Sequence, residues 1–180
     1  MSRIYEIADK YVDALAALDP STATALGIPG HEREMPDYSP EGAARIADLN
    51  RRMASDLAAA TPENDRDGTA KEMMSERLGV QRDLYDAGEQ LRAVRIIASP
   101  LQRGRSIFDD MPKTTDEEWS DIAARLALVP RTLAGYRNTL NEGIRRGLVA
   151  SKRQALEGAK QAETWSAAGE GQKTYFDGLL

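Results

Sequence analysis

The sequence contains no cysteine and only one histidine among its 180 residues. The absence of cysteine excludes disulfides, cysteine-containing zinc sites, iron–sulfur clusters and thiol nucleophiles. A single histidine cannot supply the two or three imidazoles that most zinc enzymes use. We therefore expect these residues to contain no metal ligands and no catalytic residues of their own.

Positive charge and long apolar runs are also scarce. The chain has 24 Lys and Arg against 29 Asp and Glu, which gives a formal net charge of −5. Without a basic block, a nucleic-acid partner is not expected. No segment approaches the 18 apolar residues of a membrane span, and charges interrupt residues 3–13, so neither a membrane partner nor a secretory leader is predicted. We expect a cytoplasmic protein.

Strand-favouring residues are few, whereas alanine is abundant. The sequence has 27 alanines, against 14 valines and isoleucines together. Alanine has the highest helix propensity, and β-branched residues favour strands. The composition therefore predicts an all-α, multi-helix bundle, with residues 1–180 forming a single helical domain.

Capping residues and apolar spacing predict where the helices begin and end. An apolar stripe predicts one long helix interrupted at Ser99-Pro100, and Pro130 predicts a break or kink in a later helix. The other predicted segments are a helix over 3–18, a short helix from Asp19-Pro20 to Gly27, a helix from Ser39-Pro40 to about Ala60, and helices beginning at the capping boxes Thr115/Glu118 and Ser151/Gln154. The residues of the long stripe are Met73, Val80, Leu84, Ala87, Leu91 and Val94.

The segment from Ala98 to Gln102 is the strongest candidate for a binding site, and it has two interpretations. In the structural one, Ser99 caps a new helix and Gln102 completes a capping box. In the functional one, polar and basic side chains form a cleft wall that binds a peptide or a carboxylate through charge-assisted hydrogen bonds. The candidate substrate-binding residues are Ser99, Gln102, Arg103 and Arg105.

The single histidine, His31, lies in a loop beside Glu32 and Glu34. These side chains are of types that bind metals, and a neighbouring carboxylate raises the proton affinity of an imidazole. A loop histidine next to acids is more often simply solvated. We therefore assign His31 no metal-binding or catalytic role.

Five segments, taken in order, resemble the N-terminal part of the bacterial family called domain of unknown function 885. They are residues 11–20 (YVDALAALDP), 23–28 (ATALGI), 36–41 (PDYSPE), 98–102 (ASPLQ) and the run 129–144. The resemblance covers essentially the whole sequence. None of the segments is a catalytic motif.

The resemblance implies a larger α-helical protein that acts as a zinc-dependent metallopeptidase, carboxypeptidase-like in type. Family members carry an H-E-x-x-H motif, in which two histidines bind zinc and the glutamate acts as general base. That motif is absent here, so no catalytic residue is transferred from the family to this chain. The apolar end of the sequence, with Tyr175, Phe176, Leu179 and Leu180, agrees with an N-terminal fragment of a longer fold.

The leading hypothesis is that these helices form part of the substrate-cleft wall of such a peptidase without being catalytic themselves. The remainder of the polypeptide would then be their partner and would hold the zinc, while a peptide would be the substrate. A different hypothesis is a non-catalytic helical protein-interaction module. A third is a small-ligand sensor that uses the Ser99 region. The sequence leaves homo-oligomer formation open.

Overall fold

Helices account for all the regular structure in the computed structural model, which describes residues 2–166 and 173–178. No β-strand occurs in these residues, so the predicted all-α class is confirmed. The α-helices are α1 (Arg3–Leu18), α2 (Pro20–Leu26), α3 (Pro40–Ala59), α4 (Asp65–Asp86), α5 (Pro100–Ser106), α6 (Asp116–Arg146) and α7 (Lys152–Trp165). Two short 3-10 helices, η1 (Glu89–Arg92) and η2 (Phe176–Gly178), complete the described elements.

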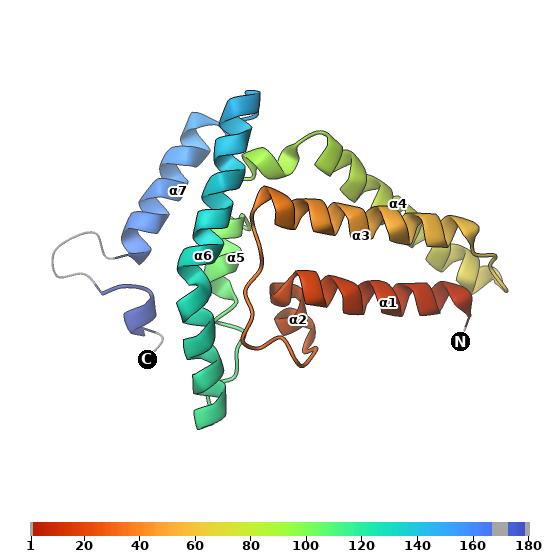
Figure 1. The fold of residues 1–180 in the computed structure, drawn as a ribbon, viewed down its shortest axis with the longest axis horizontal. Helices are drawn as coiled ribbons and strands as arrows, with labels where there is room; N and C mark the ends of the chain where they lie inside the picture. The colour runs from red at the N-terminus through yellow and green to blue at the C-terminus, as the bar shows by residue number, and fades with distance from the viewer. Residues whose placement is uncertain (1, 167–172, 179–180) are drawn as a thin grey trace.

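The helices form two groups, each with its own apolar core. In the first group α1 and α3 run side by side with α4 behind them (Figure 1), and each of the three contacts the other two. The second group consists of α5 and the long α6, with α7 on the side of α6 that faces away from α1 and α3 (Figure 1). The buried core residues are Ile4, Ile7, Leu57, Ala60 and Leu78 in the first group, and Ile107, Phe108, Met111 and Ile122 in the second.

One face of α6 has small residues, and the two groups meet there. Gly135, Thr139 and Gly143 are spaced four residues apart, so they share this face. A Cβ atom added at Gly135 would lie 3.1 Å from the backbone nitrogen of Ser39, and one at Gly143 would lie 2.3 Å from the Leu91 carbonyl oxygen. The small side chains therefore let the backbone before α3 and the backbone of η1 pack directly against the helix.

Most predicted helix ends are confirmed. Ser39 Oγ accepts the Gly42 amide at 3.1 Å, and the Thr115 capping box is formed. Ser151 Oγ accepts the amide of Gln154 at 3.3 Å. Glycines in the left-handed conformation end two further helices as predicted, at Gly27 (φ 68°) and Gly147 (φ 69°).

The apolar stripe assigned to residues 73–94 is a wrong prediction. Helix α4 ends at Asp86, and Gly88 (φ 75°) turns the chain into η1. Met73 is 67% exposed, whereas the buried apolar residue of this helix is Leu78. Helix α4 packs against two helices at once, so its buried face does not follow its most apolar spacing.

Helix α6 continues through Pro130, so the alternative of a break there is also wrong. A proline within a helix removes one amide donor and crowds the preceding turn, but tertiary contacts on both sides can hold the helix together. Here Arg125 and Thr132 are both buried. The contacts of their side chains with the rest of the molecule hold the helix on either side of the proline.

None of the described helices is both long and apolar enough to cross a membrane. Leu179 and Leu180, part of the apolar end of the sequence, lie outside the described residues.

Candidate functional site

A cleft of about 580 Å³ lies between the two helical groups. Its walls come from α1, α3 and α4 on one side and from α5, α6 and the loop before α5 on the other. Four of the six tyrosines of the chain line it: Tyr11, Tyr38, Tyr85 and Tyr136. Pockets that bind small ligands typically have volumes of about 300–1,000 Å³ and combine apolar and aromatic walls with a few polar groups. The cleft has the size and lining of such a site.

Two of the tyrosine hydroxyls make hydrogen bonds of standard geometry, and that of Tyr38 does not. Tyr11 donates to Asn50 Oδ1 at 3.0 Å, and Tyr136 donates to the Ala93 carbonyl at 3.0 Å. The buried hydroxyl of Tyr38 makes no hydrogen bond of standard geometry with any described residue, although Ser21 lies near it. Burial raises the pKa of Tyr38 well above its usual value, and the nearby Asp19 carboxylate adds to the rise. Tyr38 is therefore a neutral hydrogen-bonding group on the cleft wall.

Three arginines from three different elements also line the cleft: Arg77 from α4, Arg95 from the loop before α5, and Arg103 from α5. Arg103 has no ion-pair partner among the described residues. Arg77 has only a 3.7 Å contact with the adjacent Glu76, and Arg95 acts on Glu89 through space without direct contact. All three side chains are exposed, so a ligand at the mouth of the cleft can reach them.

The carboxylates of the lining have protein partners. Asp19 caps α2 by accepting the Ser21 amide at 3.1 Å and the Thr22 hydroxyl at 3.1 Å. Asp37 accepts the Ser39 amide at 2.9 Å and pairs with Arg45 at 2.6 Å. Burial alone would raise the pKa of Asp37, but these hydrogen bonds outweigh it and the pKa is lowered.

Glu89, the third carboxylate of the lining, forms an ion pair with Arg92, which lowers the pKa of Glu89. Two of the three lining carboxylates thus have an arginine partner, and Asp19 is hydrogen-bonded as a helix cap, whereas the lining arginines have weak ion-pair partners or none in the described part of the chain.

The four residues predicted from the sequence divide into two pairs. Ser99 and Arg103 line the cleft, whereas Gln102 and Arg105 do not. Gln102 Oε1 accepts the Ser99 amide at 2.8 Å, and its Nε2 donates to the Arg95 carbonyl at 3.0 Å and to Gln161 Oε1 at 2.7 Å. Gln102 therefore fixes the loop before α5 and ties it to α7.

Arg105 faces the C-terminal part of the structure instead of the cleft. Its guanidinium carbon lies 4.6 Å from the centre of the Tyr175 ring and 5.2 Å from that of the Trp165 ring. It also pairs with Asp109 at 3.0 Å, and the Tyr175 hydroxyl donates to the same carboxylate. Desolvation and this carboxylate raise the pKa of Tyr175 to about 12. These contacts hold residues 173–178 against α5.

Ala98, next to Ser99 on the cleft wall, has a left-handed backbone conformation with φ 59°. This conformation costs a non-glycine residue about 1 kcal/mol or more. The hydrogen bonds of Gln102 on both sides of Ala98 hold the strained backbone in place. The left-handed turn at Ala98 sets the direction in which the chain enters α5 at Ser99.

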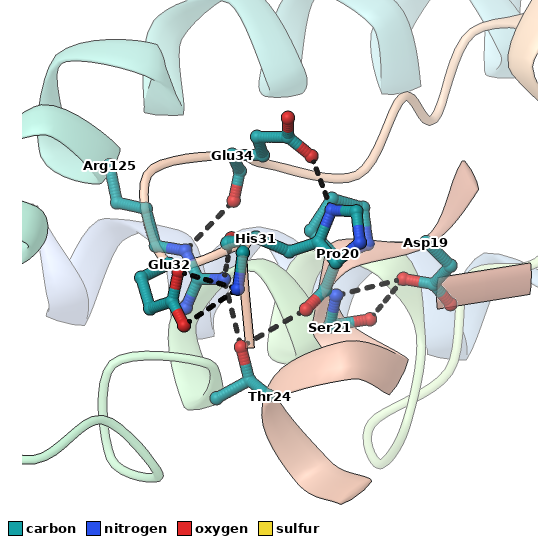
Figure 2. A network of polar contacts seen from close by, with 9 residues as sticks. Asp19, Pro20, Ser21, Thr24, His31, Glu32, Glu34 and Arg125 are labelled. Carbon is teal, nitrogen blue, oxygen red and sulfur yellow. Dashed lines mark hydrogen bonds and ion pairs between the residues drawn. The ribbon is translucent and has the colours of Figure 1, made fainter. Parts of the chain in front are cut away.

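A buried arginine positions the loop that carries Tyr38 into the cleft. Arg125 of α6 is 1% exposed, and Figure 2 shows its guanidinium reaching into the loop after α2. It donates to the carbonyls of Glu34 and His31, at 2.8 Å each, and to Thr24 Oγ1 at 2.8 Å. Burial lowers the pKa of Arg125, and no carboxylate contacts it directly. Arg125 thus anchors the loop through its backbone.

His31 Nδ1 lies 2.9 Å from Glu34 Oε2 in the same loop (Figure 2). No group of three or more His, Asp or Glu side chains in the part of the chain that the structure describes is placed to hold a metal ion. The donor set of a peptidase zinc site, with two imidazoles and a carboxylate, therefore does not fit these residues. The zinc that the resemblance implies has no site in the described part of this chain.

Sequence reasoning found Ser99 and Arg103 but missed the tyrosines, Arg77 and Arg95. The tyrosines are spread over positions 11 to 136, and no local motif connects them. Their only shared feature in the sequence is that each lies close to a predicted helix end or on a helix face. Their convergence depends on how the two helical groups pack together.

The fold and the cleft define an all-α protein with a tyrosine-lined cleft between two helical groups. Residues 20–178 match the family described as bacterial protein of unknown function (DUF885), and the chain belongs to this family. A comparison with functionally curated proteins finds no match.

Proposed function

We propose that this chain forms a non-catalytic, substrate-binding wall of a zinc-dependent peptidase, with the tyrosine-lined cleft holding part of a peptide substrate. The observation that carries the proposal is the cleft itself. It combines four tyrosines with three arginines that lack strong partners, and its volume of about 580 Å³ is typical of sites that bind small ligands. Membership of the family supports the peptidase context through the resemblance described above.

In this proposal the chain contributes binding and orientation. Ser99 and Arg103 form part of the wall, and the Arg125 anchor holds the loop of Tyr38 in place. Binding energy from groups remote from the reacting bond lowers the barrier only when it also orients the substrate. We assign the zinc ligands and the general base to the remainder of the complete polypeptide, since the residues described here do not fit a zinc site.

The proposal is tested by comparing the 180-residue chain with the complete gene product. We expect the complete protein to bind zinc and hydrolyse peptides, and the chain alone to do neither. In the complete protein, Arg103→Gln should raise KM for peptides and leave the zinc content unchanged. His31→Ala should leave both unchanged. Peptide hydrolysis by the chain alone, or a complete protein that binds zinc but cleaves no peptide, would contradict the proposal.

The second candidate is a helical interaction module, and exposed apolar side chains favour it. Ile97 is 74% exposed, Met73 67% and Ile144 66%. Large apolar side chains mark protein interaction sites where they form one contiguous patch, and this candidate requires these side chains to do so. This candidate predicts that the chain self-associates or binds a protein partner in sedimentation experiments. It also predicts that Ile97→Ser reduces the association without affecting the cleft.

A further inference from the structure

We infer that the cleft binds a small carboxylate with an apolar or aromatic body, and that Arg77, Arg95 and Arg103 form its anion subsite. The inference rests on the proposed function only in treating the cleft as a binding site. It does not depend on where the zinc lies or on whether the bound molecule is cleaved.

Charge is the first argument. The whole chain has a formal charge of −5, yet three arginines line the cleft, and of its three carboxylates only Asp19 has no arginine partner among the described residues. The carboxylates of Asp37 and Glu89 already have arginine partners outside the lining, Arg45 and Arg92. An anion that enters the cleft therefore meets guanidinium groups without first displacing a protein carboxylate. Guanidinium groups bind carboxylates through strong, often paired hydrogen bonds.

Two buried polar atoms of lining residues are the second argument. The buried Tyr38 hydroxyl and the buried Gln90 Oε1 both belong to residues of the lining, and neither has a hydrogen-bond partner of standard geometry among the described residues. Leaving such a buried group unsatisfied costs free energy. When these two side chains turn toward the cleft, a ligand with an acceptor for Tyr38 and a donor for Gln90 removes both costs, and an amide group supplies one of each.

The remaining lining indicates what the body of the ligand is. Apolar side chains line the cleft together with the four tyrosines. Aromatic rings provide large contact areas for apolar and aromatic groups. A bare phosphate would use the arginines but leave these surfaces uncovered, so the lining favours an amphipathic carboxylate. The apolar residues larger than alanine are Leu15, Leu18, Ile46, Leu84, Pro36 and Pro100.

The test is calorimetric titration of the 180-residue chain with three probes. They are the N-acetylated dipeptide Gly-Phe with a free carboxylate, the same dipeptide amidated at its C-terminus, and inorganic phosphate. We expect saturable binding of the free acid, binding of the amide about tenfold or more weaker, and weak binding of phosphate, because a charge-assisted hydrogen bond at a solvent-exposed rim accounts for about one order of magnitude in affinity.

Charge-matched variants locate the anion subsite. Arg103→Gln and Arg77→Gln should each weaken binding of the free acid about tenfold and leave binding of the amide unchanged. Arg153→Gln, on the exposed side of α7, removes the same charge away from the cleft and should have no effect. Helicity measured by circular dichroism shows whether each variant is folded. If the Arg103→Gln variant unfolds, Arg77→Gln on the long helix α4 still tests the anion subsite.

Several results would overturn the inference. These are equal affinity for acid and amide, absence of binding for both, tighter binding of phosphate than of the dipeptide, or an equal loss of affinity in Arg153→Gln. The binding results and the test of the proposed function can fail independently of each other. Selective binding of the acid together with a complete protein that cleaves no peptide would sustain the inference and refute the peptidase role, and the converse result would do the reverse.

Discussion

Replacing the buried Arg125 by Met tests whether this side chain holds the loop that carries Tyr38 into the cleft. Methionine keeps the length of the apolar stem and removes the guanidinium. The variant loses three hydrogen bonds, to Thr24 Oγ1 and to the carbonyls of His31 and Glu34. Two of the acceptors are backbone carbonyls, so both would lose a protein partner.

The expected cost follows from these three bonds. A hydrogen bond that involves a charged group contributes about 1.5 kcal/mol or more, so three contribute about 4–5 kcal/mol. Burying a guanidinium has a cost of its own, and its removal offsets roughly 1–2 kcal/mol of the loss. We therefore expect the free energy of unfolding to fall by about 3 kcal/mol, a large part of the stability of an ordinary domain.

Urea denaturation followed by circular dichroism measures this change, and hydrogen exchange locates it. The amides of residues 27–38 should exchange much faster in Arg125→Met. The exchange rates of the amides in α1 and α3 should change only by the amount that the loss of global stability accounts for. Arg137→Met, on an exposed position of the same helix, is the matched control and should change the stability by less than about 0.5 kcal/mol. A loss below about 1 kcal/mol for Arg125→Met, or unchanged exchange in the loop, would refute the anchoring role.

Three further predictions address the helix junction, the cleft and the response to acid. Gly143→Ala should destabilise the chain by more than about 2 kcal/mol in urea denaturation, because the added Cβ would lie 2.3 Å from a carbonyl oxygen. Gly79→Ala on α4 is the control: its methyl group meets open space, so it should stabilise the chain by about 0.5–1 kcal/mol. Equal effects of the two substitutions would contradict the close packing at Gly143. Tyr38→Phe should leave stability unchanged or raise it by up to about 1 kcal/mol, since the hydroxyl has no partner of standard geometry, and a clear loss on denaturation would show that the hydroxyl is bonded. Backbone amides at the capping box hold the pKa of Glu118 below its usual 4.5, so the stabilisation of the fold by the Glu118 carboxylate is present above pH 4.5 and is lost as the pH falls through the lowered pKa. Glu118→Gln should flatten that part of the curve of stability against pH. An unchanged slope would count against the cap.

Local chemistry explains which parts of the fold could be predicted from the sequence. Ser39 before Pro40, Thr115 before Glu118, and Gly147 act within three or four residues of their own position, and each ends or begins a helix as predicted. Such interactions need no knowledge of the rest of the molecule.

Long-range packing explains the parts that could not be predicted. The buried face of α4 depends on two neighbouring helices, and α6 passes through Pro130 because contacts with other elements hold it on both sides. For the site, Gln102 formed the predicted hydrogen bond with Ser99 and for that reason faces α7 instead of the cleft. Tyr11 and Tyr136 meet at one cleft only through tertiary structure.

The central claim is that the cleft between the helical groups binds a carboxylate ligand. Nuclear magnetic resonance of the arginine Nε–H groups tests it most directly, with the chain titrated with the free-acid dipeptide. The account predicts saturable shifts for Arg77, Arg95 and Arg103, and no shift for Arg153 on the exposed side of α7. Shifts that do not saturate, or saturable shifts confined to arginines outside the cleft, would contradict it.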